Sequence, residues 1–193
     1  MMNIIEKIVK WFCGCVFKVQ VNGAQNIPQS GDCMICANHI SMWDPVILYC
    51  FLPRKVRFVA KSEMKKVPVV GWILKKINCI FISRGNVDLA AMRQSLKTLS
   101  DGNVLGIFPT GTREKKNINA RPKSGCALLA AKSGTKVVPV GINATYKLFS
   151  KVVVNIGEPM DFSEYKGQKC SQQLLEQKTF EIYNKILENK SKV

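Results

Sequence analysis

The sequence predicts a single α/β domain with a mixed, largely parallel sheet flanked by helices, and an N-terminal amphipathic helix before it. Strand-like and helix-like segments alternate along the chain, which is typical of a sheet covered by helices. The 193 residues suit one domain with a substantial core. No internal repeat, low-complexity tract or interdomain linker interrupts the sequence. These three observations favour one continuous sheet rather than several small units.

The first expected element is an N-terminal helix within residues 4–19. Its large apolar residues recur at helical spacing, at Ile4, Ile5, Ile8, Trp11, Phe12, Cys15 and Val19. Charged residues interrupt the stretch, so it falls short of the ~20 apolar residues that a membrane span requires. Such a helix either lies in a membrane interface or packs on the domain. Its aromatic residues and flanking lysines favour the interface, and we expect residues 1–18 to form a membrane-interface helix and residues 19–193 to form the main domain.

Strands are expected over short apolar segments, at Cys33–Ala37, Val56–Ala60, Cys79–Ile82, Val104–Phe108, Lys136–Ile142 and Lys151–Ile156. Helices are expected after the N-terminal one at Pro45–Phe51, Pro68–Lys76, Val87–Ser100, Ser124–Lys132 and Ser171–Asn189. The helix from Val87 has the clearest signals, because Asn86 can cap its start and Gly102 follows its end. Ser41 is the expected N-cap of the helix that contains Pro45.

One expected helix has an unusual distribution of charge. The apolar block at residues 67–74 stands between the paired lysines Lys65-Lys66 and Lys75-Lys76. A block that dips into a bilayer while its lysines meet lipid headgroups would use both features. Packing in the core is the alternative.

The chain is strongly basic, with 29 Lys and Arg against 13 Asp and Glu and a net charge of +16. This excess implies an anionic partner, which is nucleic acid, an acidic membrane surface or a phosphorylated substrate. The basic residues are dispersed among apolar blocks, and no nucleic-acid-binding motif appears. We therefore expect a membrane surface and phosphorylated substrates as partners, and no nucleic acid.

The cysteines indicate structural thiols rather than a metal site. Eight cysteines without a secretory signal peptide are typical of reduced thiols in a cytosol-facing protein. Cys33 and Cys36 have CxxC spacing, but residues three apart on a strand point to opposite faces and cannot share one ion. We expect core thiols and no metal ligands.

His39 is the only histidine of the chain, and Asp44 follows it five residues later. A histidine that acts as a general base needs a carboxylate on its other ring nitrogen, which fixes the tautomer and steadies the imidazolium. The pair lies between an expected strand and an expected helix, where a side chain can reach a cleft. A satisfied structural histidine is the alternative.

Three basic turns follow expected strands or begin a helix, at Ser83–Asn86, Phe108–Arg113 and Arg121–Gly125. A tight turn with glycine, hydroxyls and an arginine can gather backbone N–H groups and a guanidinium around a phosphate. A helix N-terminus also favours anions. Each turn alone is an ordinary loop, but three of them beside one His/Asp pair indicate a site for a phosphorylated substrate.

Four blocks of the sequence resemble, in order and spacing, those of the glycerolipid acyltransferases. They are Asn38-His39 with Asp44, Ile80–Arg84, Phe108–Arg113 and Val137–Gly141. The most similar group is the PlsC type of 1-acyl-sn-glycerol-3-phosphate acyltransferases, and the resemblance covers about residues 19–160. Residues 19–193 are therefore identified as an acyltransferase domain.

The resemblance implies a role for each block. The first supplies the catalytic His39 and Asp44. The second and third hold the phosphate of the acceptor through Arg84 and through the turn Thr110-Gly111-Thr112-Arg113, with Lys123 assisting. The fourth, around Pro139, shapes the acyl or acceptor pocket. The family uses no metal and no cofactor, and its co-substrate is an acyl-CoA or acyl carrier protein thioester.

The implied activity is transfer of a fatty acyl group to the sn-2 hydroxyl of lysophosphatidate, which gives phosphatidate in phospholipid biosynthesis at the cytoplasmic face of the cell membrane. Two positions depart from the family pattern: Thr110 stands where a Glu is usual, and Ser83 stands where an Asp is usual. The first departure bears on the choice of acceptor. The alternatives are another acceptor, such as glycerol-3-phosphate or another lysophospholipid, and a non-enzymatic binder of anionic lipid or nucleic acid.

Overall fold

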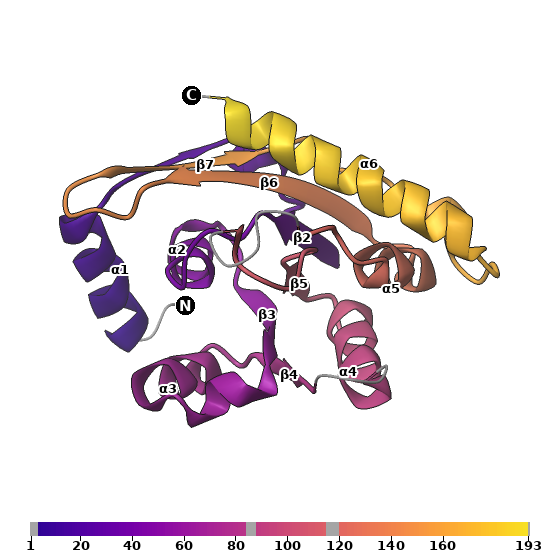
Figure 1. The fold of residues 1–193 in the computed structure, drawn as a ribbon, viewed down its shortest axis with the longest axis horizontal. Helices are drawn as coiled ribbons and strands as arrows, with labels where there is room; N and C mark the ends of the chain where they lie inside the picture. The colour runs from indigo at the N-terminus through magenta and orange to yellow at the C-terminus, as the bar shows by residue number, and fades with distance from the viewer. Residues whose placement is uncertain (1–3, 84–87, 115–119, 193) are drawn as a thin grey trace.

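The protein is an α/β domain whose sheet is covered by helices on both faces (Figure 1). The computed structural model describes residues 4–83, 88–114 and 120–192. Within them seven strands form one sheet in the order β1-β7-β6-β2-β5-β3-β4. Neighbouring strands of this sheet are parallel, except that β6 and β7 run antiparallel. The expected fold class, a mixed and largely parallel sheet flanked by helices, is confirmed.

The strands are β1 Lys18–Asn22, β2 Cys33–Ala37, β3 Val56–Lys61, β4 Ile80–Ile82, β5 Val104–Ile107, β6 Lys136–Ala144 and β7 Lys151–Ile156. The helices are α1 Ile4–Val16, α2 Asp44–Phe51, α3 Pro68–Lys76, α4 Leu89–Ser100, α5 Gly125–Ser133 and α6 Gln172–Ser191. Each expected strand and helix has a counterpart in this list. The expected ends shift by one or two residues at most places, because helix and strand ends are set by capping and pairing.

Strand β1 has no counterpart among the expected elements. Sequence reading assigned Val19 to the N-terminal helix, and the structure places it in β1, paired with Val152 of β7. The strand is short and lies at the edge of the sheet, so its own residues carry little periodic signal. Its partner, far away in the sequence, stabilises it. The helix α1 therefore ends at Val16, before the expected boundary at residue 18.

Two helix starts also differ from expectation. Ser41 was the expected cap of α2, but this helix begins at Asp44 with Trp43 as its N-cap residue, and Ser41 lies one turn upstream. The Asp44 carboxylate instead accepts backbone hydrogen bonds from Ile40 and Ser41, in the segment before the helix. Helix α4 is capped by Asp88, whose side chain accepts a hydrogen bond from Ala91 N. The expected cap Asn86 lies outside the described residues.

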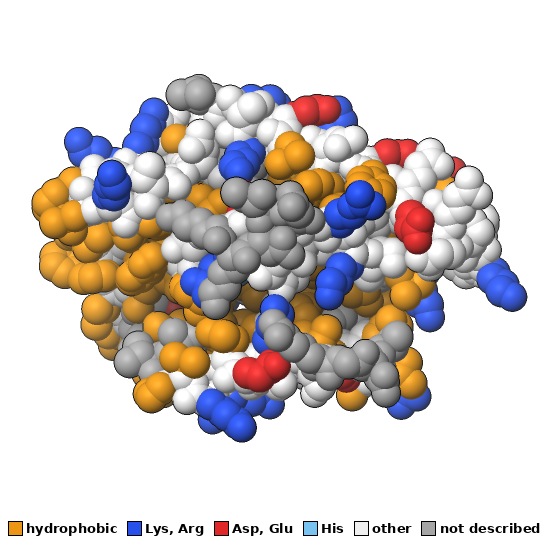
Figure 2. Space-filling model, in the orientation of Figure 1, with side chains coloured by type: hydrophobic (Ala, Val, Ile, Leu, Met, Phe, Trp, Pro, Cys, Tyr) orange, Lys and Arg blue, Asp and Glu red, His pale blue; other side chains and the backbone are white. Residues whose placement is uncertain are grey.

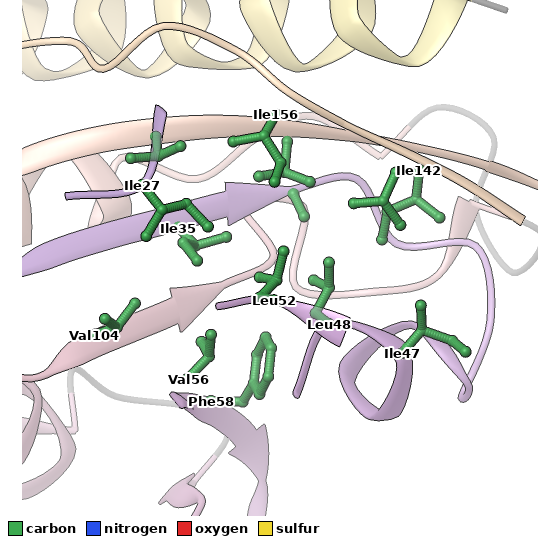
Figure 3. Close-up of a cluster of buried hydrophobic side chains, with 14 of the residues drawn as sticks. Ile27, Ile35, Ile47, Leu48, Leu52, Val56, Phe58, Val104, Ile142 and Ile156 are labelled. Carbon is green, nitrogen blue, oxygen red and sulfur yellow. The ribbon is translucent and has the colours of Figure 1, made fainter. Parts of the chain in front are cut away.

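Two hydrophobic layers sandwich the sheet. Helices α1, α2 and α3 pack on one face, where Figure 3 shows Leu48 of α2 near Phe58 of β3. Helices α4, α5 and α6 cover the other face. Because both faces of β2 are covered, all five of its residues are buried, as a continuous apolar strand requires.

Burial of the cysteines follows these two layers. Cys33 lies in the layer under α1 to α3 and Cys36 in the layer under α4 to α6, so the expected opposite orientation of the CxxC pair is confirmed. Cys13, Cys50, Cys79 and Cys126 are also buried. The expectation of core thiols is wrong for Cys15, which is exposed on α1, and only partly right for Cys170, which is half-buried.

The fourth sequence block packs α6 against the sheet. A Cβ on Gly141 of β6 would lie 2.1 Å from the backbone nitrogen of Lys190, so only glycine permits this approach of helix and strand. Asn155 of β7 donates hydrogen bonds to the carbonyl oxygens of Asn189 at 2.9 Å and Lys192 at 2.7 Å. Figure 1 shows α6 lying along β6 as a result. Pro139 is buried in this strand, and the pocket-shaping role implied for it stays a prediction.

Helix α1 both packs on the domain and presents an apolar surface. Cys13 is buried, and Glu6 accepts hydrogen bonds from the Tyr49 hydroxyl at 2.7 Å and from the Lys55 ammonium at 2.8 Å. The opposite side of the helix exposes large apolar side chains, at Ile4, Ile8, Trp11 and Phe12. Packing on the domain and docking at a membrane interface are the alternatives that the sequence leaves open. The structure shows that α1 packs on the domain, and docking through its exposed apolar side stays a prediction.

Candidate active site

The candidate site lies at one edge of the sheet, beyond the carboxyl ends of the parallel strands β2 and β5. These two strands are neighbours, so the segments that follow them meet. The contact is direct: the N–H of Glu114, in the loop after β5, donates to the carbonyl oxygen of His39 at 2.8 Å. Two blocks that are about seventy residues apart in the sequence thus share one site.

The His39 imidazole and the Asp44 carboxylate form a hydrogen-bonded pair, with Nδ1 and Oδ2 2.7 Å apart. Asp44 is fully buried, and its Oδ2 also accepts the backbone N–H groups of Ile40 and Ser41, each at 2.7 Å. Its Oδ1 accepts the hydroxyl of Tyr146 at 2.7 Å. A buried carboxylate is tolerated only when it is hydrogen-bonded in this way. Because Nδ1–H donates to Asp44, the lone pair of the imidazole lies on Nε2, where a general base needs it.

The plane of the imidazole is held by an aromatic stack. Phe108, the first residue after β5, stacks on His39 with ring centroids 4.2 Å apart and an angle of 20° between the rings. Phe58 of β3 stacks with Phe108, with ring centroids 5.7 Å apart. The His39 side chain keeps 16% of its surface exposed. The stack therefore fixes the plane of the imidazole, and part of the side chain stays exposed.

Asn38 fixes the segment that carries His39. Its side-chain amide donates to the carbonyl oxygen of Ile142 at 2.9 Å and accepts the N–H of Ile142 at 2.7 Å. This two-way pairing ties the end of β2 to β6 in a fully buried setting. In the sequence, Asn38 stands out only as a member of the block that contains His39. Its place immediately before the catalytic candidate was the available signal for this role.

The turn after β5, where the sequence predicts an anion site, is a tight glycine turn. Gly111 adopts a positive φ of 63° and is exposed, and its N–H closes the turn on the carbonyl of Phe108 at 2.9 Å. Lys123 is bound to this turn by its backbone N–H, which donates to Pro109 O at 3.0 Å. Its side-chain Cε lies 3.9 Å from where a Cβ on Gly111 would stand. The fold thus brings together Gly111 and Lys123, two residues that are expected to hold the phosphate.

Thr110 supports the turn from inside. Its side chain is only 5% exposed, and its hydroxyl donates to the carbonyl oxygen of Thr112 at 2.9 Å. Arg113 follows Thr112 and precedes Glu114, the residue bonded to His39. Its guanidinium has no hydrogen bond or ion pair within the described part of the chain. Direct contact of Thr110, Thr112 or Arg113 with a substrate stays a prediction.

The second block reaches the same edge of the sheet. Ser83 follows β4, and its N–H donates to the carboxylate of Asp88 at 2.8 Å. Arg84, the expected phosphate ligand of this block, lies outside the described residues. Asp88 thus supplies a carboxylate to the loop in which Ser83 replaces the usual Asp.

Two further residues of the site were missed by sequence reading. Tyr146 lies beyond β6, about a hundred residues from the carboxylate that it contacts, and only the fold brings it there. Glu114 accepts a hydrogen bond from the Lys190 ammonium through Oε2 at 2.7 Å, while its buried Oε1 has no hydrogen-bond partner among the described residues. Neither residue stands in a recognisable sequence pattern.

Comparison with known proteins decides the family. The family model described as Acyltransferase matches residues 18–143, which include His39, Asp44 and the turn after β5. The chain belongs to the acyltransferase family. The resemblance read from the four blocks is confirmed at this level.

Named relatives and a solved structure agree with this family. The 1-acyl-sn-glycerol-3-phosphate acyltransferase of Borreliella burgdorferi is 31% identical over 80% of this chain, and the match covers 62% of the relative. The enzyme of the same name from Bacillus subtilis is 27% identical over 87% of this chain and 89% of its own length. The crystal structure of the 1-acyl-sn-glycerophosphate (LPA) acyltransferase PlsC from Thermotoga maritima superposes with a TM-score of 0.70 at 27% identity, covering 98% of this acyltransferase and 81% of that chain.

Proposed function

We propose that this acyltransferase moves a fatty acyl group from an acyl thioester to the sn-2 hydroxyl of lysophosphatidate and so makes phosphatidate for phospholipid biosynthesis. The observation that carries the proposal is the His39–Asp44 pair, with Asp44 buried and His39 partly exposed, whose His39 carbonyl accepts the N–H of Glu114 after the glycine turn at 2.8 Å. The names of the Borreliella and Bacillus relatives support lysophosphatidate as the acceptor.

The proposed reaction is a direct transfer. Nε2 of His39 accepts the proton of the acceptor hydroxyl while its oxygen attacks the thioester carbonyl. A C–O bond forms, the C–S bond breaks, and the thiolate of CoA or of acyl carrier protein leaves with the proton from the imidazolium. Asp44 steadies the imidazolium between these steps. Arg113, the Gly111 turn and Lys123, together with Arg84, hold the phosphate so that the hydroxyl meets His39 in a productive pose.

A covalent acyl-enzyme is not part of this mechanism. Burial raises the pKa of Cys33 to about 11 and that of Cys79 to about 12. Such thiols stay protonated at neutral pH and are poor nucleophiles, because the thiolate is the reactive form. Among the described residues no serine or cysteine side chain is hydrogen-bonded to the His39 imidazole, so in this proposal the acceptor hydroxyl is the nucleophile that His39 activates.

The proposed activity is tested by thiol release from acyl-CoA and from acyl carrier protein thioester, each with a panel of acceptors. We expect rapid release with lysophosphatidate and slow release with glycerol-3-phosphate or without an acceptor. Mass spectrometry of the lipid product should show phosphatidate. Faster turnover with another acceptor would replace lysophosphatidate in the proposal, and release that is independent of any acceptor would exclude acyl transfer.

We further propose that the enzyme works at the anionic surface of the cytoplasmic face of the membrane. No helix in residues 4–83, 88–114 and 120–192 is both long and apolar enough to cross a bilayer. The exposed apolar side of α1 supports a docking role, with Trp11 70% exposed, and Figure 2 shows apolar side chains gathered over this helix at the left of the view. Helix α3 adds Trp72, which is 54% exposed while Leu74 of the same helix is buried.

The apolar surface reaches the site itself. The ring of Phe12 lies 6.4 Å from that of Trp43, which immediately precedes Asp44. Beyond α1, the loop between β6 and β7 exposes Leu148 and Phe149, and the N–H of Phe149 donates to the carbonyl of Val16 at 2.8 Å. A lipid acceptor whose acyl chain stays in the bilayer would therefore find its headgroup close to the dyad.

Changing Trp11 and Phe12 to Ser should weaken binding to anionic vesicles by about tenfold or more, since a large apolar side chain taken from water contributes about 1.5–3 kcal/mol. Higher salt should weaken binding further, because the attraction of each surface Lys or Arg is screened. Sedimentation with phosphatidylglycerol vesicles measures both effects. The matched control changes Phe180 and Leu187, two exposed apolar residues of α6 on the other face of the domain, to Ser. Equal losses in both variants would contradict docking through α1.

A further inference from the structure

We propose that Tyr146 is a positioning residue of the catalytic dyad, which holds the Asp44 carboxylate in the orientation that directs Oδ2 toward His39. The inference rests on the proposed acyl transfer and adds a residue that lies outside the four sequence blocks.

The oxygens of Asp44 have separate partners. Oδ2 accepts Nδ1–H of His39 and the N–H groups of Ile40 and Ser41, all from the segment before α2. Oδ1 accepts only the Tyr146 hydroxyl among the hydrogen bonds of the described residues, at 2.7 Å. Rotation of the carboxylate about its Cβ–Cγ bond would break the contact with Tyr146 as well as those on Oδ2. Tyr146 therefore locks the carboxylate from the side opposite the histidine.

The Tyr146 ring is itself held in place. It meets the ring of Phe17 edge to face, with centroids 5.4 Å apart and an angle of 86°. Phe17 in turn meets Trp43 at 5.7 Å, so the Tyr146 ring belongs to a connected cluster of three aromatic rings. The Tyr146 backbone has a φ of 55°, a region that bulky residues rarely occupy. Such conformations persist where the surrounding structure determines them, and they are concentrated at functional sites.

The hydroxyl acts as a hydrogen-bond donor throughout the working pH range. Burial raises the pKa of Tyr146, and the negative charge of Asp44 raises it further. The phenol therefore keeps its proton and cannot add a second negative charge beside Asp44. A donor that stays neutral fixes the carboxylate without neutralising it by proton transfer, so Asp44 remains able to steady the imidazolium.

Tyr146→Phe tests the inference, because it removes the hydroxyl and keeps the ring on Phe17. We expect kcat with lysophosphatidate and acyl-CoA to fall about tenfold, the size expected for a hydrogen bond to a charged group, with both KM values within about twofold of wild type. The matched control is Tyr49→Phe, which removes a hydroxyl that also donates to a carboxylate at 2.7 Å, that of Glu6. The control should keep wild-type kcat, and thermal melting of both variants should confirm folding.

A double-mutant cycle separates positioning from a general packing role. If Tyr146 acts through Asp44, Tyr146→Phe should lower kcat by less than about twofold in the Asp44→Asn background, because the charged acceptor is already absent. Full additivity, or wild-type kcat in Tyr146→Phe alone, would overturn the inference.

A second readout does not depend on turnover. His39 is the only histidine, so nitrogen-labelled histidine gives one imidazole in the NMR spectrum. We expect Tyr146→Phe to shift or broaden its Nδ1–H signal and Tyr49→Phe to leave it unchanged. An unchanged signal in Tyr146→Phe would overturn the inference. An inactive wild-type enzyme whose signal still responds to Tyr146→Phe would contradict the proposed function and retain the positioning role.

Discussion

His39→Ala should lower kcat for acyl transfer to lysophosphatidate by about 10²–10⁴-fold, the usual contribution of a general base. The variant removes the imidazole, whose Nε2 is placed to accept the hydroxyl proton. The fold should survive, because the buried Asp44 keeps the two backbone N–H groups and the Tyr146 hydroxyl as hydrogen-bond donors. Steady-state thiol release with saturating lysophosphatidate measures the loss, and circular dichroism checks the fold.

Asp44→Asn is the companion variant. It keeps the imidazole but removes the charge that steadies the imidazolium, so its kcat should lie between those of wild type and His39→Ala. Because the Asp44 side chain is fully buried and accepts four hydrogen bonds, this variant should also lose thermal stability. A folded His39→Ala protein with wild-type turnover would remove the proposed mechanism.

The second large effect concerns the phosphate of the acceptor. Arg113→Ala should lower kcat/KM for lysophosphatidate by about one to two orders of magnitude, since a hydrogen bond to a charged group contributes roughly 1.5–3 kcal/mol. The loss should appear mainly in KM for lysophosphatidate and much less in KM for acyl-CoA. Arg113 is suited to this role because it lies one residue from the bond between Glu114 and His39. The same assay applied to Arg84→Ala tests the second block.

Net charge provides the control for this prediction. Arg93 lies on the exposed side of α4, and Arg93→Ala removes the same charge from the surface. Its effect on kcat/KM should be small, because an exposed surface charge that does not contact the acceptor is largely screened at moderate salt. Equal rises of both KM values in Arg113→Ala, or equal losses in the Arg113 and Arg93 variants, would show that the arginine acts through overall charge rather than by holding the phosphate.

Much of the fold could be predicted because its signals are local. The strand β2 is a run of five apolar residues, and α3 and β7 have the expected bounds. These elements could be predicted because hydrophobic periodicity and the position of proline are properties of neighbouring residues. The His39–Asp44 pair could also be predicted from the sequence, because its two members are five residues apart on one short segment. Strand β1 could not be predicted, since this short edge strand depends on pairing with β7, more than a hundred residues away in the sequence.

The sequence by itself determined the α/β class, the His39–Asp44 dyad and the basic turn after β5, all of which depend on residue types at short spacing. Only the tertiary structure decided which other groups complete the site. The parallel pairing of β2 with β5 brings the turn to His39, the pairing with β6 lets Asn38 bind Ile142, and the loop after β6 delivers Tyr146 to Asp44. These contacts join residues separated by about seventy to more than a hundred positions. No local pattern encodes them, because the free energy that selects them comes from burying the whole sheet between its two helical layers.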